Sequence, residues 1–91
     1  MKLGRVLGTV IATRKDKAIE GVKLYLLQPL NSRGNPEGDI LVAVDGVGAR
    51  EGDLVFYVRS REATLAIKGR VIPAHAGIVG IVDNVRFEEE N

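Results

Sequence analysis

The stretch VAVDGVGAREGDLVFY, residues 42–57, decides the fold because it reads as a strand, a glycine-rich corner and a second strand. The apolar run ends at Asp45-Gly46, a pair typical of turns, since Asp bonds nearby backbone and Gly tolerates positive φ. Alternation over residues 54–59 then predicts a strand. The glycines of the corner predict a tight backbone path or a close approach by another group. In a monomer that group would be a ligand or a crossing strand, and in a symmetric oligomer it could be the same loop of a neighbour. If φ at Gly46 is positive, we expect Gly46→Val to block folding or assembly.

Working outward, five stretches rich in Val, Ile and Leu predict strands. They cover residues 3–13, 22–30, 40–44, 54–59 and 76–87, and turn residues fill the segment 31–39. One short helix is expected over residues 60–68, with Ser60 as N-cap and Gly69 as stop. The fold class predicted is all-β, a small five-stranded barrel with one short helix. We expect residues 1–91 to form a single domain, with the barrel in 1–87 and an acidic tail at 88–91.

Three of these strands, the first, second and fifth, carry apolar residues on both faces. In the first strand, Val6 and Val10 fall on one face, whereas Leu3 and Leu7 fall on the other. A small barrel buries only its inner face, and contiguous exposed apolar surface usually marks an interface. The pattern therefore predicts a homo-oligomer in which outer strand faces pack against neighbours.

The composition argues against several classes of function. The 91 residues carry 13 Lys and Arg against 12 Asp and Glu, for a net charge of +1, which is no basic footprint for nucleic acid. Cysteine is absent, which excludes disulfides and zinc–thiolate sites. No apolar run approaches the roughly 20 residues of a membrane span. We expect no nucleic-acid partner and no membrane partner.

Candidate catalytic groups are sparse. His75 is the single histidine, and without a cysteine or second histidine it is better interpreted as a structural or surface residue than as a metal ligand or base. Gly46-Val47-Gly48 resembles the opening of a dinucleotide loop. The next glycine comes one residue late, at Gly52, and a strand follows instead of a helix, which favours a tight turn. The sequence predicts no enzyme, with no catalytic, cofactor-binding or metal-binding residues and no cofactor.

An alternative function is an oligonucleotide-binding module. Such barrels stack bases on aromatic side chains, and the candidates here are Tyr25, Phe56, Tyr57 and Phe87. With aromatics at only 4% of residues and a near-zero net charge, each is better interpreted as core or interface.

Four stretches, in order along the chain, resemble the EutN/CcmL family of bacterial microcompartment vertex proteins. They are similar to the family's G-x-V-V-x-T strand, its G-x-K-L-L-L-V strand, its D-x-V-G-A-G-x-G-E corner and its P-V-D-A-x-V-V-x-I-V-D segment. The matching residues are 8–13 (GTVIAT), 21–27 (GVKLYLL), 45–52 (DGVGAREG) and 73–83 (PAHAGIVGIVD).

The resemblance implies a barrel of the oligonucleotide-binding type that assembles as a cyclic pentamer. Such pentamers cap the vertices of an icosahedral shell tiled by hexameric shell proteins, in the bacterial cytoplasm, as in carboxysomes and metabolosomes. The glycine-rich corner would then lie near the five-fold axis. The candidate pore residues are Gly46, Val47, Gly48, Ala49 and Arg50.

The chain departs from the family pattern in three places. Arg50 stands where the corner has its second G-A-G glycine, residues 59–64 replace the usual helix entry, and His75 stands where the motif has Asp. Five symmetry-related copies of Arg50 near an axis would form a positive ring that favours anions. The alternative is that Arg50 points outward into solvent.

Overall fold

The computed structural model describes residues 2–10, 23–60, 65–67, 70–72 and 74–83. Within these ranges the chain has seven strands and no helix. They are β1 (Lys2–Val10), β2 (Lys23–Pro29), β3 (Leu41–Asp45), β4 (Leu54–Arg59), β5 (Leu65–Ile67), β6 (Arg70–Ile72) and β7 (Ala76–Ile81).

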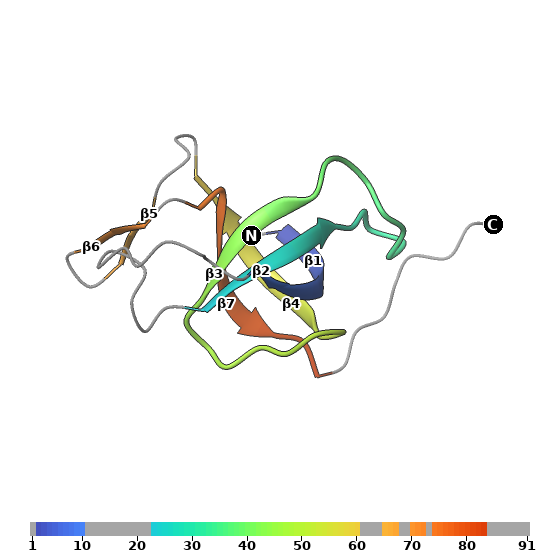
Figure 1. Ribbon diagram of the computed structural model, residues 1–91. Coiled ribbons are helices and arrows are strands. Elements are labelled where there is room, and N and C mark those ends of the chain that lie inside the picture. Colours follow the sequence, from blue (N-terminus) through green and yellow to red (C-terminus); the bar gives the residue numbers. More distant parts are fainter. Residues whose placement is uncertain (1, 11–22, 61–64, 68–69, 73, 84–91) are drawn as a thin grey trace.

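Five of the strands close into a barrel in the order β1-β2-β3-β7-β4, with β4 returning to β1 (Figure 1). All neighbours in the barrel are antiparallel except β3 and β7, which run parallel from Ala43 opposite Ala76 to Asp45 opposite Ile78. The predicted small five-stranded barrel is confirmed. Its last strand lies between β3 and β4, not at an edge.

The barrel interior is filled by aliphatic side chains and two tyrosines. Val6 and Leu27 are cross-strand partners on β1 and β2, and with Val55 they are the largest fully buried side chains. Tyr25 and Tyr57 are also buried. On β1, a Cβ at Gly4 would lie 3.0 Å from Leu27 Cδ1, so the glycine lets the two strands pack closely.

The faces predicted for the first strand are wrong beyond its middle. The register shifts so that Val6 lies opposite Leu27 while Gly8 lies opposite Leu26, which leaves Leu7 as an extra residue in a bulge. Because a one-residue shift reverses which face each side chain occupies, Val10 does not share the inner face with Val6. It packs against the outer cluster of Leu24 and Val44 instead.

The predicted helix over residues 60–68 is also wrong. Leu65–Ile67 form β5, which pairs antiparallel with Arg70–Ile72 of β6 as a separate two-stranded sheet outside the barrel (Figure 1). Apolar and β-branched residues on both sides of Lys68-Gly69 favour a hairpin, and this pattern outweighed a thin apolar helix face. The proposed helix entry at residues 61–64 lies outside the described residues.

The end of the fifth predicted strand needs revision. β7 ends at Ile81, so Val82 and Asp83 of the predicted fifth strand are not part of it. Residues 11–13 of the first predicted strand, and residues 84–91 with the acidic tail, lie outside the described part of the chain.

Candidate functional site

The glycine-rich corner between β3 and β4 is organised by the carboxylate of Asp45. Its Oδ1 accepts a hydrogen bond from the backbone N–H of Val47 at 3.0 Å, and its Oδ2 accepts from Gly48 at 3.2 Å and Ala49 at 3.1 Å. One side chain at the end of β3 therefore satisfies three successive N–H groups of the loop. These contacts hold the corner in one conformation without a regular element.

The far half of the corner is joined to the barrel. Gly52 N–H donates to Val6 O at 2.8 Å, and Val6 N–H donates to Asp53 O at 2.9 Å. The buried Tyr25 hydroxyl donates to Ala49 O at 2.6 Å. The loop is thus fixed to β1 from outside and to β2 through the core, which makes it a rigid surface for another molecule to contact.

Two glycines of the corner have left-handed backbone conformations, at Gly48 (φ 82°) and Gly52 (φ 88°). Gly46 does not have a positive φ, and a Cβ built there meets nothing within 4 Å. The expectation that Gly46→Val blocks folding or assembly depended on a positive φ at Gly46, and this condition is not met. The tight turn itself, favoured above a phosphate loop, is present, and it leads into β4.

The five candidate pore residues lie together in this loop. Ala49 is buried, whereas Gly46, Val47, Gly48 and Arg50 are exposed. The backbone N–H of Arg50 donates to Asp53 Oδ2 at 2.9 Å, while its side chain lies at the surface. The corner therefore presents a backbone with few side chains, one valine and one guanidinium.

Two apolar faces lie on the outside of the barrel. The first, the β2 face, consists of Leu7, Leu26 and Val42; Leu26 is the cross-strand partner of both Val42 and Gly8. Leu7 and Leu26 are exposed at 39% and 38%, and Val42 is half-buried. The prediction that the first and second strands carry apolar residues on both faces is confirmed.

The second, the β4 face, consists of Leu3, Phe56, Val58 and Val79. Phe56 lies opposite Leu3 on β1 and Gly80 on β7. Phe56, Val58 and Val79 are exposed at 38%, 42% and 45%. Sequence reasoning missed the contribution of β4, although Val55 and Tyr57 alternating with Phe56 and Val58 already put apolar side chains on both of its faces.

His75 joins the start of β7 to the neighbouring strand β3. Its Nδ1 accepts a hydrogen bond from Val42 N–H at 3.1 Å, and its own backbone N–H donates to Val42 O at 2.8 Å. Its backbone O accepts from Ser60 N–H at 2.8 Å. The exposed His75 is therefore a structural residue, as the sequence favoured.

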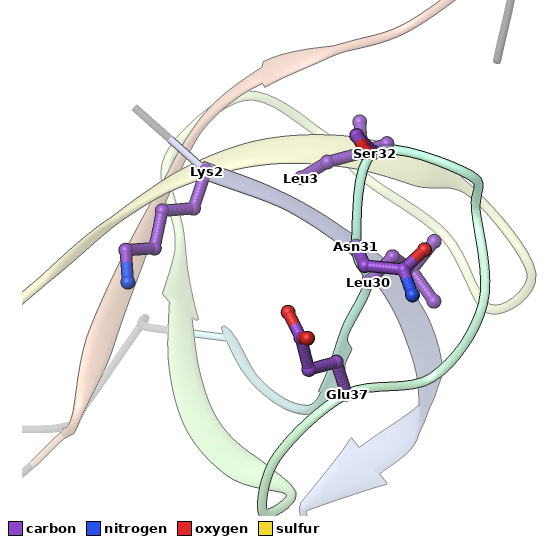
Figure 2. A pocket seen from close by; sticks show the side chains of 6 residues that line it. All are labelled: Lys2, Leu3, Leu30, Asn31, Ser32 and Glu37. Atoms are coloured by element: carbon purple, nitrogen blue, oxygen red, sulfur yellow. The ribbon is translucent and has the colours of Figure 1, made fainter. Parts of the chain in front are cut away.

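A hollow of about 490 Å³ lies where the start of β1 meets the loop that follows β2. Figure 2 shows Lys2 on one side of it, the Glu37 carboxylate reaching in from the loop, and Leu3, Leu30, Asn31 and Ser32 on the other side. Asn31 Oδ1 accepts from the N–H groups of Arg33 and Asn35, which holds the loop in shape. The charged groups that line the hollow are one lysine and one carboxylate.

Other site classes find little support in the described ranges. No three metal-ligating side chains of His, Cys, Asp or Glu come together among those residues. In the same part of the chain, no helix has the length and apolar character to cross a membrane. Of the proposed base-stacking aromatics, Tyr25 and Tyr57 are buried in the barrel, Phe56 belongs to the β4 face, and Phe87 lies outside the described residues.

Comparison with known proteins covers nearly the whole chain. The family described as ethanolamine utilisation protein EutN/carboxysome matches residues 1–83. A carboxysome shell vertex protein CcmL from Gloeobacter violaceus is 38% identical over 97% of this chain and 88% of its own length. The microcompartment shell vertex protein EutN of Escherichia coli K12 is 34% identical over 93% of this chain and 90% of its own length. The solved structure of the pentameric microcompartment shell protein GrpN from Rhodospirillum rubrum superposes with a TM-score of 0.75, at 33% identity, over 98% of this chain and all of that one. The chain belongs to the EutN/CcmL family of microcompartment vertex proteins.

Proposed function

We propose that this protein is a structural vertex protein, five copies of which form a ring that closes a vertex of a bacterial microcompartment shell. The main support for this proposal is that the barrel carries apolar side chains on its outer faces as well as in its interior. Eight large hydrophobic side chains of the described residues are exposed on the single chain, most of them on strands. A relative of the same fold, GrpN, is a pentameric shell protein.

The mechanism of such a protein is geometric. Burying apolar area contributes about 25 cal/mol per Å², so covering the outer faces between protomers drives assembly. Sheets of hexameric shell proteins are flat, and a five-fold unit at a vertex introduces the curvature that closes them. The lateral edges of the ring are the surfaces that meet these hexamers. We infer a structural role without catalysis, in a shell within the bacterial cytoplasm.

We also propose that the corner from Gly46 to Arg50 lies beside the five-fold axis. Its bare backbone permits close approach between protomers, and the Asp45 hydrogen bonds keep it in one conformation. The exposed Arg50 of each chain then contributes to a ring of positive charge that favours anions. Calorimetric titration with an inorganic anion should show weaker binding for Arg50→Ala than for wild type. Identical binding would contradict the ring.

The native mass of the purified chain tests the proposal directly. Native mass spectrometry, or light scattering after size exclusion, should give about 49 kDa, five times the monomer mass of 9.8 kDa. A monomer would overturn the proposal. The oligonucleotide-binding alternative would then be tested by titration with single-stranded DNA at several salt concentrations.

A further inference from the structure

The two outer apolar faces lie on different sides of the barrel. The neighbours of β2 are β1 and β3, whereas those of β4 are β1 and β7. A single two-fold contact would bury one face against its own copy and leave the other in water. A ring of identical chains is built on head-to-tail contacts, in which each interface uses two different surfaces of the chain. One such contact, repeated around the ring, covers both faces of every protomer.

The two faces also differ in shape. On the β4 face, Phe56 lies opposite Gly80 of β7 and Val58 lies opposite the buried Gly77, and Val79 is the side chain that β7 contributes to this face. A Cβ at Gly80 would already lie 3.9 Å from Phe56 Cδ2, so the ring lies next to bare backbone. On the β2 face, Leu26 is 38% exposed and lies opposite Gly8, where a Cβ would meet nothing within 4 Å.

Few charged side chains lie on the strands that form the two faces. Strands β2, β3 and β4 carry charged side chains only at their ends, at Lys23, Asp45 and Arg59, and β7 carries none. Strand β1 carries Lys2 at its start and Arg5, whose guanidinium donates a hydrogen bond to Gly52 O at 2.9 Å. Burying the middle of β2, β3, β4 and β7 therefore leaves no unpaired charge in the interface. An unpaired buried charge would cost several kcal/mol.

We propose that the β2 face of one protomer packs against the β4 face of the next, with Leu26 in contact with Phe56 and Val58. The partner is a second copy of this chain. The inference rests on the proposed ring and adds which two surfaces form each of its interfaces.

Cross-linking tests the pairing, because the natural chain has no cysteine to interfere. The variant carrying both Leu26→Cys and Val58→Cys is treated with a short bis-maleimide and run on a denaturing gel. Leu26 lies opposite Gly8 of β1, whereas Tyr57, the neighbour of Val58, lies opposite Lys2, so positions 26 and 58 are about 20 Å apart along β1. A short reagent therefore joins chains and does not bridge one chain. We expect a ladder from two chains to five. Each single variant should give no ladder, and a mixture of the two should give cross-linked pairs only.

The exposed Asp39 on the β2–β3 loop provides a matched control. Asp39→Cys combined with Val58→Cys should give no ladder. Cross-linking of Leu26→Cys with itself would overturn the proposal, because it would show that the β2 face packs against its own copy. A native pentamer that gives no ladder with the double variant would also overturn it, while leaving the ring intact. Failure of the wild-type ring itself appears separately, as a monomeric native mass before any reagent is added.

Discussion

The side chain of Asp45 should be worth more to stability than any other exposed or half-buried carboxylate in the described chain. Asp45→Ala removes three hydrogen bonds of 3.0–3.2 Å to the backbone of the corner. Hydrogen bonds contribute about 1 kcal/mol each, and more when one partner is charged. Because the carboxylate is only half-buried, water replaces part of the loss. The expected cost is about 2–3 kcal/mol of unfolding free energy.

The assay is urea unfolding followed by far-ultraviolet circular dichroism, at one fixed protein concentration because subunit association adds to apparent stability. At about 4–8 °C per kcal/mol for a domain of this size, the melting temperature should fall by roughly 10 °C or more. Asp45→Asn keeps one acceptor oxygen and should lose about half as much. Asp39→Ala, an exposed carboxylate, is the matched control and should stay within about 0.5 kcal/mol of wild type. An Asp45→Ala protein as stable as that control would refute the assignment of the corner to this side chain.

Three further predictions use the same unfolding assay. Gly48→Ala should cost about 1–2 kcal/mol because φ there is 82°, whereas Gly46→Ala should be close to neutral; equal effects would contradict the backbone assignment. Burial raises the pKa of the Tyr57 phenol above its usual 10.0, so its stabilising contribution is complete below pH 10 and is lost as pH rises through the raised pKa. Tyr57→Phe should therefore show a shallower alkaline loss of stability than wild type, and an unchanged slope would contradict this. His75→Ala should cost about 1 kcal/mol by removing the acceptor for Val42 N–H, and His75→Asp should restore most of it; a neutral His75→Ala would show that the bond contributes nothing.

The barrel strands could be predicted from sequence because their signals are local. The alternation of residues 54–59 predicted β4, and Asp45-Gly46 at the end of β3 predicted the corner. The two-faced strands indicated surfaces covered by other chains, and Leu26 is exposed as that reasoning requires.

The errors came from features that depend on partners distant in sequence. The bulge at Leu7 is set by the register of β1 against β2, and the sequence of β1 alone does not indicate it. The β5–β6 hairpin was mistaken for a helix because Ser60 and Gly69 are good cap residues, although β-branched residues on both sides of Lys68-Gly69 favoured strands. Positive φ occurs at Gly48 and Gly52 and not at Gly46, and the spacing of the three glycines alone does not distinguish them.

The position of β7 has a consequence for how the chain folds. This strand is the last of the barrel in sequence, yet it lies between β3 and β4 and supplies the single parallel pairing among the barrel strands. Until β7 pairs with them, β3 and β4 each have an unpaired edge. The barrel closes only when Ala43 of β3 pairs with Ala76 of β7. Long-range pairing of this kind slows folding, so a nascent chain that lacks its last strand is expected to be open and prone to associate through those edges. Closure is therefore a late event, and a chain truncated before Ala76 should aggregate in a light-scattering assay, whereas a soluble, folded fragment would contradict this order of events.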